Sequence, residues 1–347
     1  PDQPMLTTPG GILLVLAVLV PFVGLLVGLV LGGRHAQRVA AVTLLAGLAI
    51  VGGAATTLLQ SGDTVVYLLG GWAPPLGIAL RADSLSVGMM LAVAVVVCGI
   101  GLYARSDFGN AAGAPEARAS FTYWLLLLAV WGSLNLVFVS GDLFTLYVAL
   151  ELLTFSGVPL VCLDGRGETL RAALRYLLFA LAGSLLYLLG AVLLYGAYGT
   201  LDIALLAERI RPEPVAWTVA ALMTVGLLAK TALFPLHLWL PPAHAGAPAA
   251  ASAVLSALVI KGSWFLVVRL WFDVMPGVVT LSAAQLLAGL GAAAIVVGSV
   301  VALRQERLKL LVAYSTIAQI GYLFLMFPLA FDAAGSTLVH GPALKIR

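Results

Sequence analysis

The sequence predicts an all-α protein that crosses a membrane many times. Of its 347 residues, 62% are hydrophobic and only 10% are charged, whereas soluble domains have about half apolar and a quarter charged residues. Apolar runs recur from residue 11 to residue 331, and a helix needs roughly 20 such residues to cross a bilayer. We therefore expect a polytopic helical protein embedded in the lipid bilayer.

The length of each apolar run places the individual spans. We expect about ten spanning helices, at residues 11–32, 38–60, 84–104, 120–139, 143–163, 172–198, 214–236, 249–272, 281–303 and 310–331. Part of an eleventh apolar segment follows, and no signal peptide stands apart from the first run. The chain begins Pro1-Asp2 and stops at Arg347, so we expect a fragment of a longer protein.

Two connecting segments have patterns of their own. "TVVYLLGGWAPPLGIALRADSLS" (64–86) has two β-prone runs around a Gly- and Pro-rich turn, which predicts a small extracytoplasmic β-hairpin at about residues 62–83. "LDIALLAERI" (201–210) is typical of a short amphipathic helix at the membrane surface.

The basic residues of the connecting segments predict the orientation. With the N-terminus outside, the inner loops hold Arg34, Arg38, Arg105, Arg118, Arg166, Arg171, Arg175, Arg304, Arg307 and Lys309, and the outer loops hold Arg81, Arg209 and Arg211. Loops that carry more Lys and Arg stay on the cytoplasmic side. We therefore expect a multi-pass protein of the inner or plasma (cytoplasmic) membrane with its N-terminus outside.

Charge and cysteine content exclude several classes of protein. The net charge of +3 comes from basic residues spread singly over loops, which argues against nucleic acid as a partner. Cys98 and Cys162 lie inside apolar runs without CxxC spacing, and we interpret them as buried small hydrophobes. We expect no disulfide framework, no metal site and no cofactor.

Three ionisable residues of the predicted spans indicate a pathway, whereas Arg269, nearer the end of its span, is better explained by snorkelling or anchoring. Glu151 is in the middle of the fifth, Lys230 is near the end of the seventh, and Lys261 is in the middle of the eighth. A charge at the bilayer centre costs ~3 kcal/mol on insertion scales, so each is expected to be paired, protonated or facing internal water. A buried ion pair that locks helices together is the structural alternative for Glu151, and snorkelling is the alternative for Lys261.

The seventh span also contains helix-breaking prolines. Pro235 lacks a backbone donor, and Pro241-Pro242 cannot continue a helix, so we expect the helix to be broken between about Thr231 and His244. Broken helices at membrane depth are tolerated where they line cavities, and they often mark ion sites in transporters.

Other polar residues near these spans have less specific interpretations. We expect His237 and His244 to line a polar cavity at the break, with satisfied structural histidines as the alternative. A metal site lacks a third ligand at suitable spacing. Asp142 opens the fifth span, where an acidic N-cap is expected.

Three stretches together resemble a known family. They are "ALELLTFSGVPLV", "LLAKTALFPLHLWLPPAHAGAPAAASAVLSALVIKGSWFLVVRL" and "LKLLVAYSTIAQIGYLF". They resemble the antiporter-type membrane subunits shared by respiratory complex I, membrane-bound hydrogenases and Mrp-type sodium/proton antiporters. The outer segment "GGWAPPLGIALRADSLS" is most similar to the D-type subunit of the Mrp branch.

The resemblance implies roles for particular residues. The family's proton-relay positions fall on Glu151, Lys230 and Lys261, and its histidine positions fall on His237 and His244. In that family the glutamate and the first lysine form a pair whose making and breaking drives proton uptake. The second lysine then passes the proton toward the subunit centre.

The resemblance also implies an organisation into repeats. Two inverted five-helix repeats are expected, the first formed by spans four to eight with a broken seventh helix. The chain then divides into a three-helix region with the outer hairpin (1–119), the first antiporter repeat (120–272) and a truncated start of the second (273–347). Leu310 replaces the family's usual arginine, and His340 and Lys345 are similar to the next His-and-Lys element with a spacing one residue too long.

These expectations lead to a function with open alternatives. The resemblance implies a membrane subunit of a multisubunit cation/proton antiporter that carries protons, coupled to sodium or another monovalent cation, beside other membrane subunits. The alternative is a proton-pumping subunit of an NADH–quinone oxidoreductase or membrane-bound hydrogenase, although the chain has no GxGxxG, iron–sulfur or haem motif of its own. A Schiff-base lysine for a retinal-like chromophore is a third interpretation, disfavoured by the prolines after Lys230.

Overall fold

The computed structural model describes residues 6–109 and 117–331. Within this part of the chain, ten helical segments are long and apolar enough to cross a membrane. They are α1 (Ile12–Leu31), α2 (Gly33–Ser61), α3 (Ser84–Phe108), α4 (Arg118–Val139), α5 (Leu143–Val161), α6 (Gly167–Tyr198), α8 (Pro214–Thr231), Ala249–Val274, α12 (Leu281–Leu303) and Leu308–Ala330. The predicted all-α polytopic fold is confirmed. The expected eleventh segment, with His340 and Lys345, lies outside the described residues.

Two of the ten segments are assembled from shorter pieces. Ala249–Val274 contains α10 (Ala249–Val254), a π-helical turn (Leu255–Val259), α11 (Ile260–Arg269) and a second π-helical turn (Leu270–Val274). Leu308–Ala330 contains α13 (Leu308–Phe324) followed by a 3-10 turn. A π-helical turn adds a residue to the helical register and is frequent at functional sites.

The chain forms two compact units. The first consists of residues 1–165 and 248–262, and the second of residues 166–247 and 263–346, as far as these are described. Glu151 and Lys261 therefore belong to the first unit, while Lys230, His237 and His244 belong to the second.

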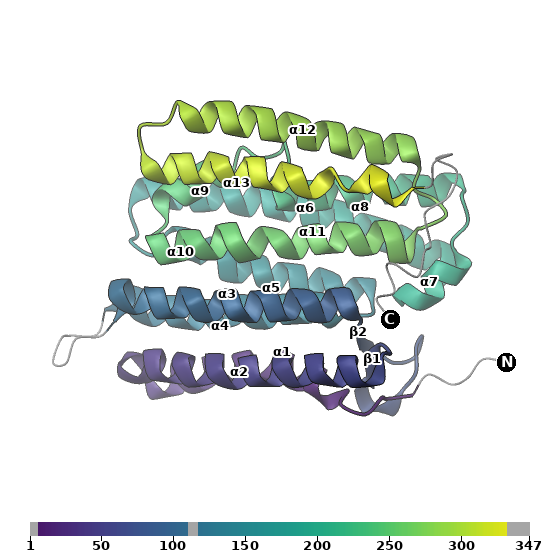
Figure 1. The fold of residues 1–347 in the computed structure, drawn as a ribbon, viewed down its shortest axis with the longest axis horizontal. Helices are drawn as coiled ribbons and strands as arrows, with labels where there is room; N and C mark the ends of the chain where they lie inside the picture. The colour runs from purple at the N-terminus through teal and green to yellow at the C-terminus, as the bar shows by residue number, and fades with distance from the viewer. Residues whose placement is uncertain (1–5, 110–116, 332–347) are drawn as a thin grey trace. The chain divides into compact units, whose positions relative to one another are not determined.

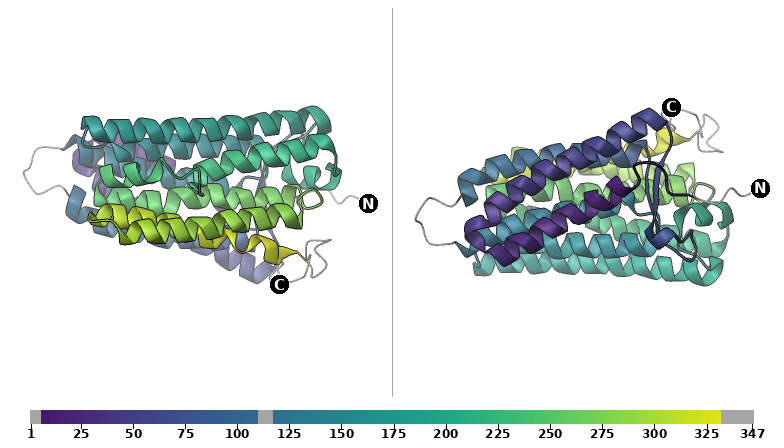
Figure 2. Two further views of the ribbon diagram at one scale, coloured as in Figure 1. Left: turned by 90° about the horizontal axis from the view of Figure 1, so that it is seen from above. Right: turned by 90° about the horizontal axis from the view of Figure 1, so that it is seen from below.

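In the first unit, α1 and α2 lie side by side (Figure 2, right). The Asn135 side chain on α4 donates a 2.7 Å hydrogen bond to the carbonyl of Ala17 and so joins α4 to α1. Strands β1 (Val65–Leu68) and β2 (Ala79–Ala82) pair antiparallel at one end of these helices (Figure 1). This is the predicted hairpin. Backbone and side-chain hydrogen bonds between Thr8 and Val66 hold the N-terminal segment against it.

In the second unit, α6 packs along α8, and α12 packs along α13 (Figure 1). The short helix α7 (Ile203–Arg209) forms where the amphipathic pattern predicts one. Asp202 caps its N-terminus by accepting from the Leu205 backbone N–H, and Leu206 is fully buried beneath it. The amphipathic pattern is satisfied by this one buried face.

The outward faces of the spans are apolar. On α6, Leu178, Leu185 and Val192 are 59%, 63% and 59% exposed. Such a surface would be unfavourable in water, at about 25 cal/mol for each Å². In a bilayer it costs nothing, because lipid tails are as apolar as leucine.

Candidate functional site

The second unit contains a broken helix. Helix α8 ends at Thr231, and Ala232 follows in the left-handed conformation with φ of 59°. After Pro235 and a series of turns, α9 (Leu240–Gly246) begins. The predicted broken seventh helix is confirmed.

The break is shorter than the sequence predicts. Pro241 and Pro242 lie in the first turn of α9 instead of extending the break toward His244. In the first turn of a helix the backbone N–H has no intrahelical partner, so a proline there loses nothing and its fixed φ already suits the helix. The expectation that these two prolines keep the chain non-helical was wrong.

Hydrogen bonds at the break satisfy backbone groups that a continuous helix would pair differently. The Leu233 N–H donates to Leu228 O at 3.2 Å, which skips the usual acceptor, Ala229. The carbonyl of Ala229 accepts from the Ala232 N–H at 3.4 Å and from the indole N–H of Trp239 at 2.9 Å. Trp239 is 1% exposed and stacks on Tyr176 of α6, with ring centroids 4.3 Å apart. Trp239 thus forms a hydrogen bond across the break and packs the break against α6.

Lys230 is held in a narrow, buried position near the end of α8. It is 6% exposed, and α8 approaches α6 closely beside it. A methyl group at Gly183 of α6 would stand 2.5 Å from the carbonyl oxygen of Gly226 and 3.3 Å from Cγ of Lys230. The absence of a side chain at Gly183 therefore makes room for the lysine stem.

The residue after Lys230 links α8 to α11. The Thr231 hydroxyl donates to Leu227 O at 2.7 Å and is hydrogen-bonded to the Ser263 hydroxyl at 3.1 Å. Both side chains are almost fully buried. This hydroxyl pair fixes the last turn of α8 and places polar atoms beside the break.

The two histidines occupy different surroundings. His237 lies within the break, 7% exposed and stacked on Phe234 with ring centroids 5.4 Å apart. It lines a cavity of about 500 Å³ together with residues of α6 and α13. His244 lies on α9, is fully buried and is not among the residues that line this cavity.

A further lysine, Lys309, forms a hydrogen bond to the C-terminal end of α9. Lys309, in the first turn of α13, donates from Nζ to the carbonyl of Ala247 at 2.8 Å. Ala247 is the C-cap of α9, where unpaired carbonyls make the helix end partly negative. The charge of Lys309 stabilises this end and joins α13 to the broken helix.

In the first unit, Glu151 lies on α5. Asp142 caps the N-terminus of this helix by accepting from the N–H groups of Phe144 and Thr145 at 3.0 and 2.9 Å, as the sequence predicts. Glu151 is half-buried nine residues further along, about 13 Å into the span. It therefore lies near the middle of the helix and away from its capped end.

Lys261 lies on an adjacent segment of the same unit. Helix α5 packs against α10 and the π-helical turn Leu255–Val259, and Lys261 follows that turn by two residues. A methyl group at Gly262 would come within 3.1 Å of Leu153 on α5 and 2.9 Å of Leu134 on α4. The structure therefore places the helices of Glu151 and Lys261 in direct contact.

The expected approach of Glu151 to Lys230 stays a prediction, as does the alignment of all three ionisable residues along one seam. Within the described residues, no three His, Cys, Asp or Glu side chains are arranged to hold a metal ion.

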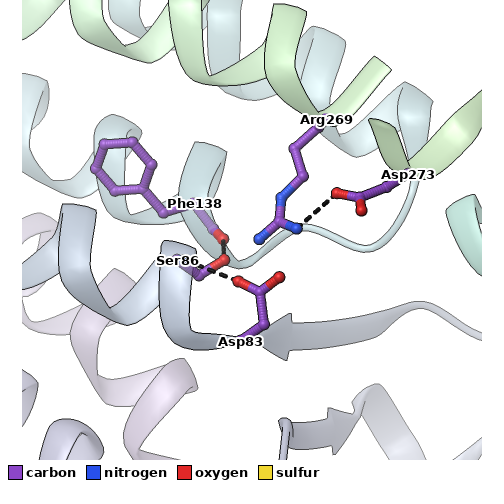
Figure 3. A network of polar contacts seen from close by, with 5 residues as sticks. All are labelled: Asp83, Ser86, Phe138, Arg269 and Asp273. Atoms are coloured by element: carbon purple, nitrogen blue, oxygen red, sulfur yellow. Dashed lines mark hydrogen bonds and ion pairs between the residues drawn. The ribbon is translucent and has the colours of Figure 1, made fainter. Parts of the chain in front are cut away.

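Polar contacts at the ends of spans are structural. Arg269 forms a 2.6 Å ion pair with Asp273 one turn later (Figure 3). Its guanidinium also lies over the Phe265 ring, 4.9 Å from the ring centroid. In the first unit, the Ser86 hydroxyl donates to Phe138 O at 2.6 Å (Figure 3). Such contacts anchor span ends and explain why Arg269 is compatible with its span.

Sequence reasoning missed several of these residues. Tryptophan, threonine, serine and glycine are common in membrane helices for many reasons, so nothing in the pattern distinguishes Trp239, Thr231, Ser263 or Gly183. Lys309 appears in the sequence only as one more inner-loop cation. The spacing of apolar residues does not reveal the π-helical turn before Lys261.

The fold and the site define an integral, multi-pass helical membrane protein with ionisable side chains on its spans and beside a broken helix. A family comparison assigns it more narrowly. The chain belongs to the family described as "NADH:quinone oxidoreductase/Mrp antiporter, TM", which matches residues 140–341.

Individual relatives represent both branches of this family. The chain is 36% identical over 289 residues to the N-type subunit of NADH-quinone oxidoreductase from Desulforudis audaxviator, covering 81% of this chain and 57% of that protein. It is 32% identical over 327 residues to the D-type subunit of the Na(+)/H(+) antiporter from Alkalihalophilus pseudofirmus, covering 90% of this chain and 62% of that protein.

A solved structure has the same fold. A chain of the membrane-bound sulfane sulfur reductase, an archaeal respiratory membrane complex, superposes with a TM-score of 0.82 and 28% identity, over 91% of this chain and 64% of that chain. The present chain thus spans about three fifths of the length of these proteins.

Proposed function

We propose that this chain is part of a membrane subunit of a multisubunit cation/proton antiporter. Protons would move through it by way of Glu151, Lys230 and Lys261, coupled to sodium or another monovalent cation. The observation that carries the proposal is Lys230, which is 6% exposed in the last turn of α8, next to the break.

The chemistry of lysine suits this role. Burial disfavours the charged form of an amine, while a nearby carboxylate favours it. A lysine between these two influences exchanges its proton when a neighbouring charge moves, whereas arginine keeps its proton throughout. Opposite charges at short range in a poorly solvated interior interact by several kcal/mol, which is enough to decide which lysine is protonated.

The relatives support the remaining parts of the proposal. The Na(+)/H(+) antiporter relative is named as one subunit of a larger assembly, and the solved structure is that of a respiratory membrane complex, so we infer that other membrane subunits are partners. We also propose the cytoplasmic membrane as the location, with the N-terminus outside. Residues 120–272 would form the first antiporter repeat and residues 273–347 the start of the second.

The test is a pair of substitutions at the proposed relay. In vesicles containing the full-length subunit and its partners, Lys230→Arg and Glu151→Gln are expected to slow dissipation of a pH gradient by at least about tenfold, equivalent to about 1.4 kcal/mol in the barrier. Arginine cannot release the proton, and glutamine removes the charge that controls it.

Lys309→Arg is the matched control, because Lys309 donates to a backbone carbonyl and an arginine can do the same. We expect its transport rate to equal that of the wild type. Wild-type transport by Lys230→Arg at equal expression would show that Lys230 is structural and that the relay is wrong.

A second candidate function has support of its own. The 36% identity to the N-type subunit of an NADH-quinone oxidoreductase favours a proton-pumping subunit of a redox complex. Purification of the tagged subunit from its native membrane separates the two: copurifying iron–sulfur proteins indicate the redox pump, and small membrane proteins alone indicate the antiporter.

A further inference from the structure

The cavity beside the break is amphipathic. It has a volume of about 500 Å³, and its lining residues all belong to the second unit: they come from α6, from the break with the start of α9, and from α13. Its polar lining comes from Arg175, His237 and Tyr314. The other lining residues are apolar: Phe179, Leu238, Pro241, Pro242 and Leu310.

The length of α6 predicts that Arg175 lies near the boundary between the hydrocarbon and the lipid headgroups. Helix α6 has 32 residues and is about 48 Å long, whereas the hydrocarbon core of a bilayer is about 30 Å thick. Arg175 is eight residues after Gly167, about 12 Å along the helix. If α6 is centred in the bilayer, the Arg175 backbone lies about 3 Å inside the hydrocarbon, and its side chain reaches the phosphates.

The same end of the unit is strongly basic. The basic residues at the start of α6 and around the turn between α12 and α13 are Arg166, Arg171, Arg175, Arg304, Arg307 and Lys309, and the acidic residues there are Glu168 and Glu306. This excess of positive charge favours an anion. Basic pockets between membrane helices on the cytoplasmic side are typical sites for anionic lipid headgroups.

The apolar lining begins next to the arginine. Phe179 is four residues after Arg175 and therefore lies on the same face of α6, one turn deeper. Leu238 is 58% exposed and lines the same cavity. A free phosphate would bind Arg175 but leave this apolar surface uncovered. A phospholipid would contact the arginine through its headgroup and the apolar surface through its acyl chain.

We propose that this cavity binds one anionic glycerophospholipid. The Arg175 guanidinium would pair with the phosphate, and the Tyr314 hydroxyl would donate to an ester or phosphate oxygen. Phe179, Leu238 and Leu310 would contact the glycerol backbone and the first part of an acyl chain. The lipid would lie against the segment that carries His237.

The test counts bound lipid on the full-length protein, purified with its partner subunits and stripped of lipid with detergent. Phosphatidylglycerol is added back, and bound lipids are counted by native mass spectrometry. We expect the apparent affinity of Arg175→Gln for one phosphatidylglycerol to be about tenfold weaker than that of the wild type, because one charge-assisted contact is gone. At a lipid concentration that fills the site in the wild type, the variant should therefore carry one bound lipid fewer.

Arg171→Gln is the matched control, since it removes the same charge one turn earlier on α6 without lining the cavity. It should bind like the wild type. Leu310→Trp, which fills the cavity and leaves Arg175 in place, should lose the same lipid. Equal binding by the wild type, Arg175→Gln and Leu310→Trp overturns the proposal and is the result expected if a protein segment covers the cavity.

Two competitors identify the chemistry. Phosphatidylcholine, which is zwitterionic, should bind more weakly than phosphatidylglycerol. Inorganic phosphate at millimolar concentration should not displace the lipid. Displacement by inorganic phosphate would show a simple anion site, and equal binding of the two lipids would show that the basic charge plays no part; either result contradicts the proposal.

Discussion

Individual side chains replace the helical hydrogen bonds that the break removes. In a bilayer an unpaired backbone group costs several kcal/mol, since no water is available to satisfy it. At Ala229 the indole N–H of Trp239 is the additional donor. A break of this kind is therefore stable only when specific residues elsewhere in the chain supply the missing hydrogen bonds.

We predict that Trp239→Phe destabilises the protein by about 1–3 kcal/mol, because the buried carbonyl of Ala229 then keeps only the longer, 3.4 Å hydrogen bond from the Ala232 N–H. Trp264→Phe is the control: the Trp264 Nε1 is also buried but has no hydrogen-bond partner among the described residues. Thermal unfolding of the purified protein in detergent compares them. Equal losses for both variants would mean that ring volume, and not the hydrogen bond, is what matters at Trp239.

At the scale of elements, the position of Lys230 depends on close packing of two helices. Helices α6 and α8 approach through Gly183 and Gly226, and Lys230 lies against the gap that Gly183 leaves. Small residues allow such approach in membranes, where packing rather than the hydrophobic effect holds helices together. A change on α6 is therefore expected to move Lys230 without touching it chemically.

Gly183→Ala is predicted to destabilise the protein by about 1–3 kcal/mol, because its methyl group would stand 2.5 Å from a backbone oxygen and must push the helices apart. Gly196→Ala, on the same helix with no atom within 4 Å of the added methyl, should be neutral or more stable by up to about 1 kcal/mol. Unfolding midpoints measure both. Indistinguishable midpoints for the two variants would contradict the tight crossing at Gly183.

At the scale of the whole molecule, the basic residues of the loops predict which side of the membrane each loop faces. Thr8 bonds to Val66, so the N-terminal segment and the hairpin lie at the same end of the first unit. The hairpin carries a single basic residue, Arg81, whereas the turn between α12 and α13 carries Arg304 and Arg307. From the positive-inside rule we predict that the hairpin and that turn lie on opposite sides of the membrane.

Cysteine labelling tests the assignment. In a chain with Cys98 and Cys162 replaced by alanine, we expect Asp63→Cys to react with a membrane-impermeant maleimide in intact cells. Arg307→Cys should react only after the membrane is opened. Both positions are exposed, so the reverse pattern would invert the proposed orientation.

The sequence alone determined the number and approximate bounds of the spans, the hairpin, the amphipathic helix at 201–210, the Asp142 cap and the start of the break after Thr231. These features depend on local properties: the length of an apolar run, the missing backbone N–H of Pro235, or the different spacing of apolar residues in strands and in helices. A bilayer makes them decisive, because every spanning segment must satisfy its own backbone.

Only the tertiary structure decided where α9 begins after the break and which side chain donates to the Ala229 carbonyl. It also decided that Lys309 donates to the Ala247 carbonyl and that Lys230 lies against Gly183. Each depends on a partner elsewhere in the sequence; Lys309, for example, is 62 positions after Ala247. Pro241-Pro242 shows the difference: the same dipeptide breaks a helix or begins one, and its place relative to the first turn decides which. Local pattern supplies the candidates for a site, and packing between distant segments selects among them.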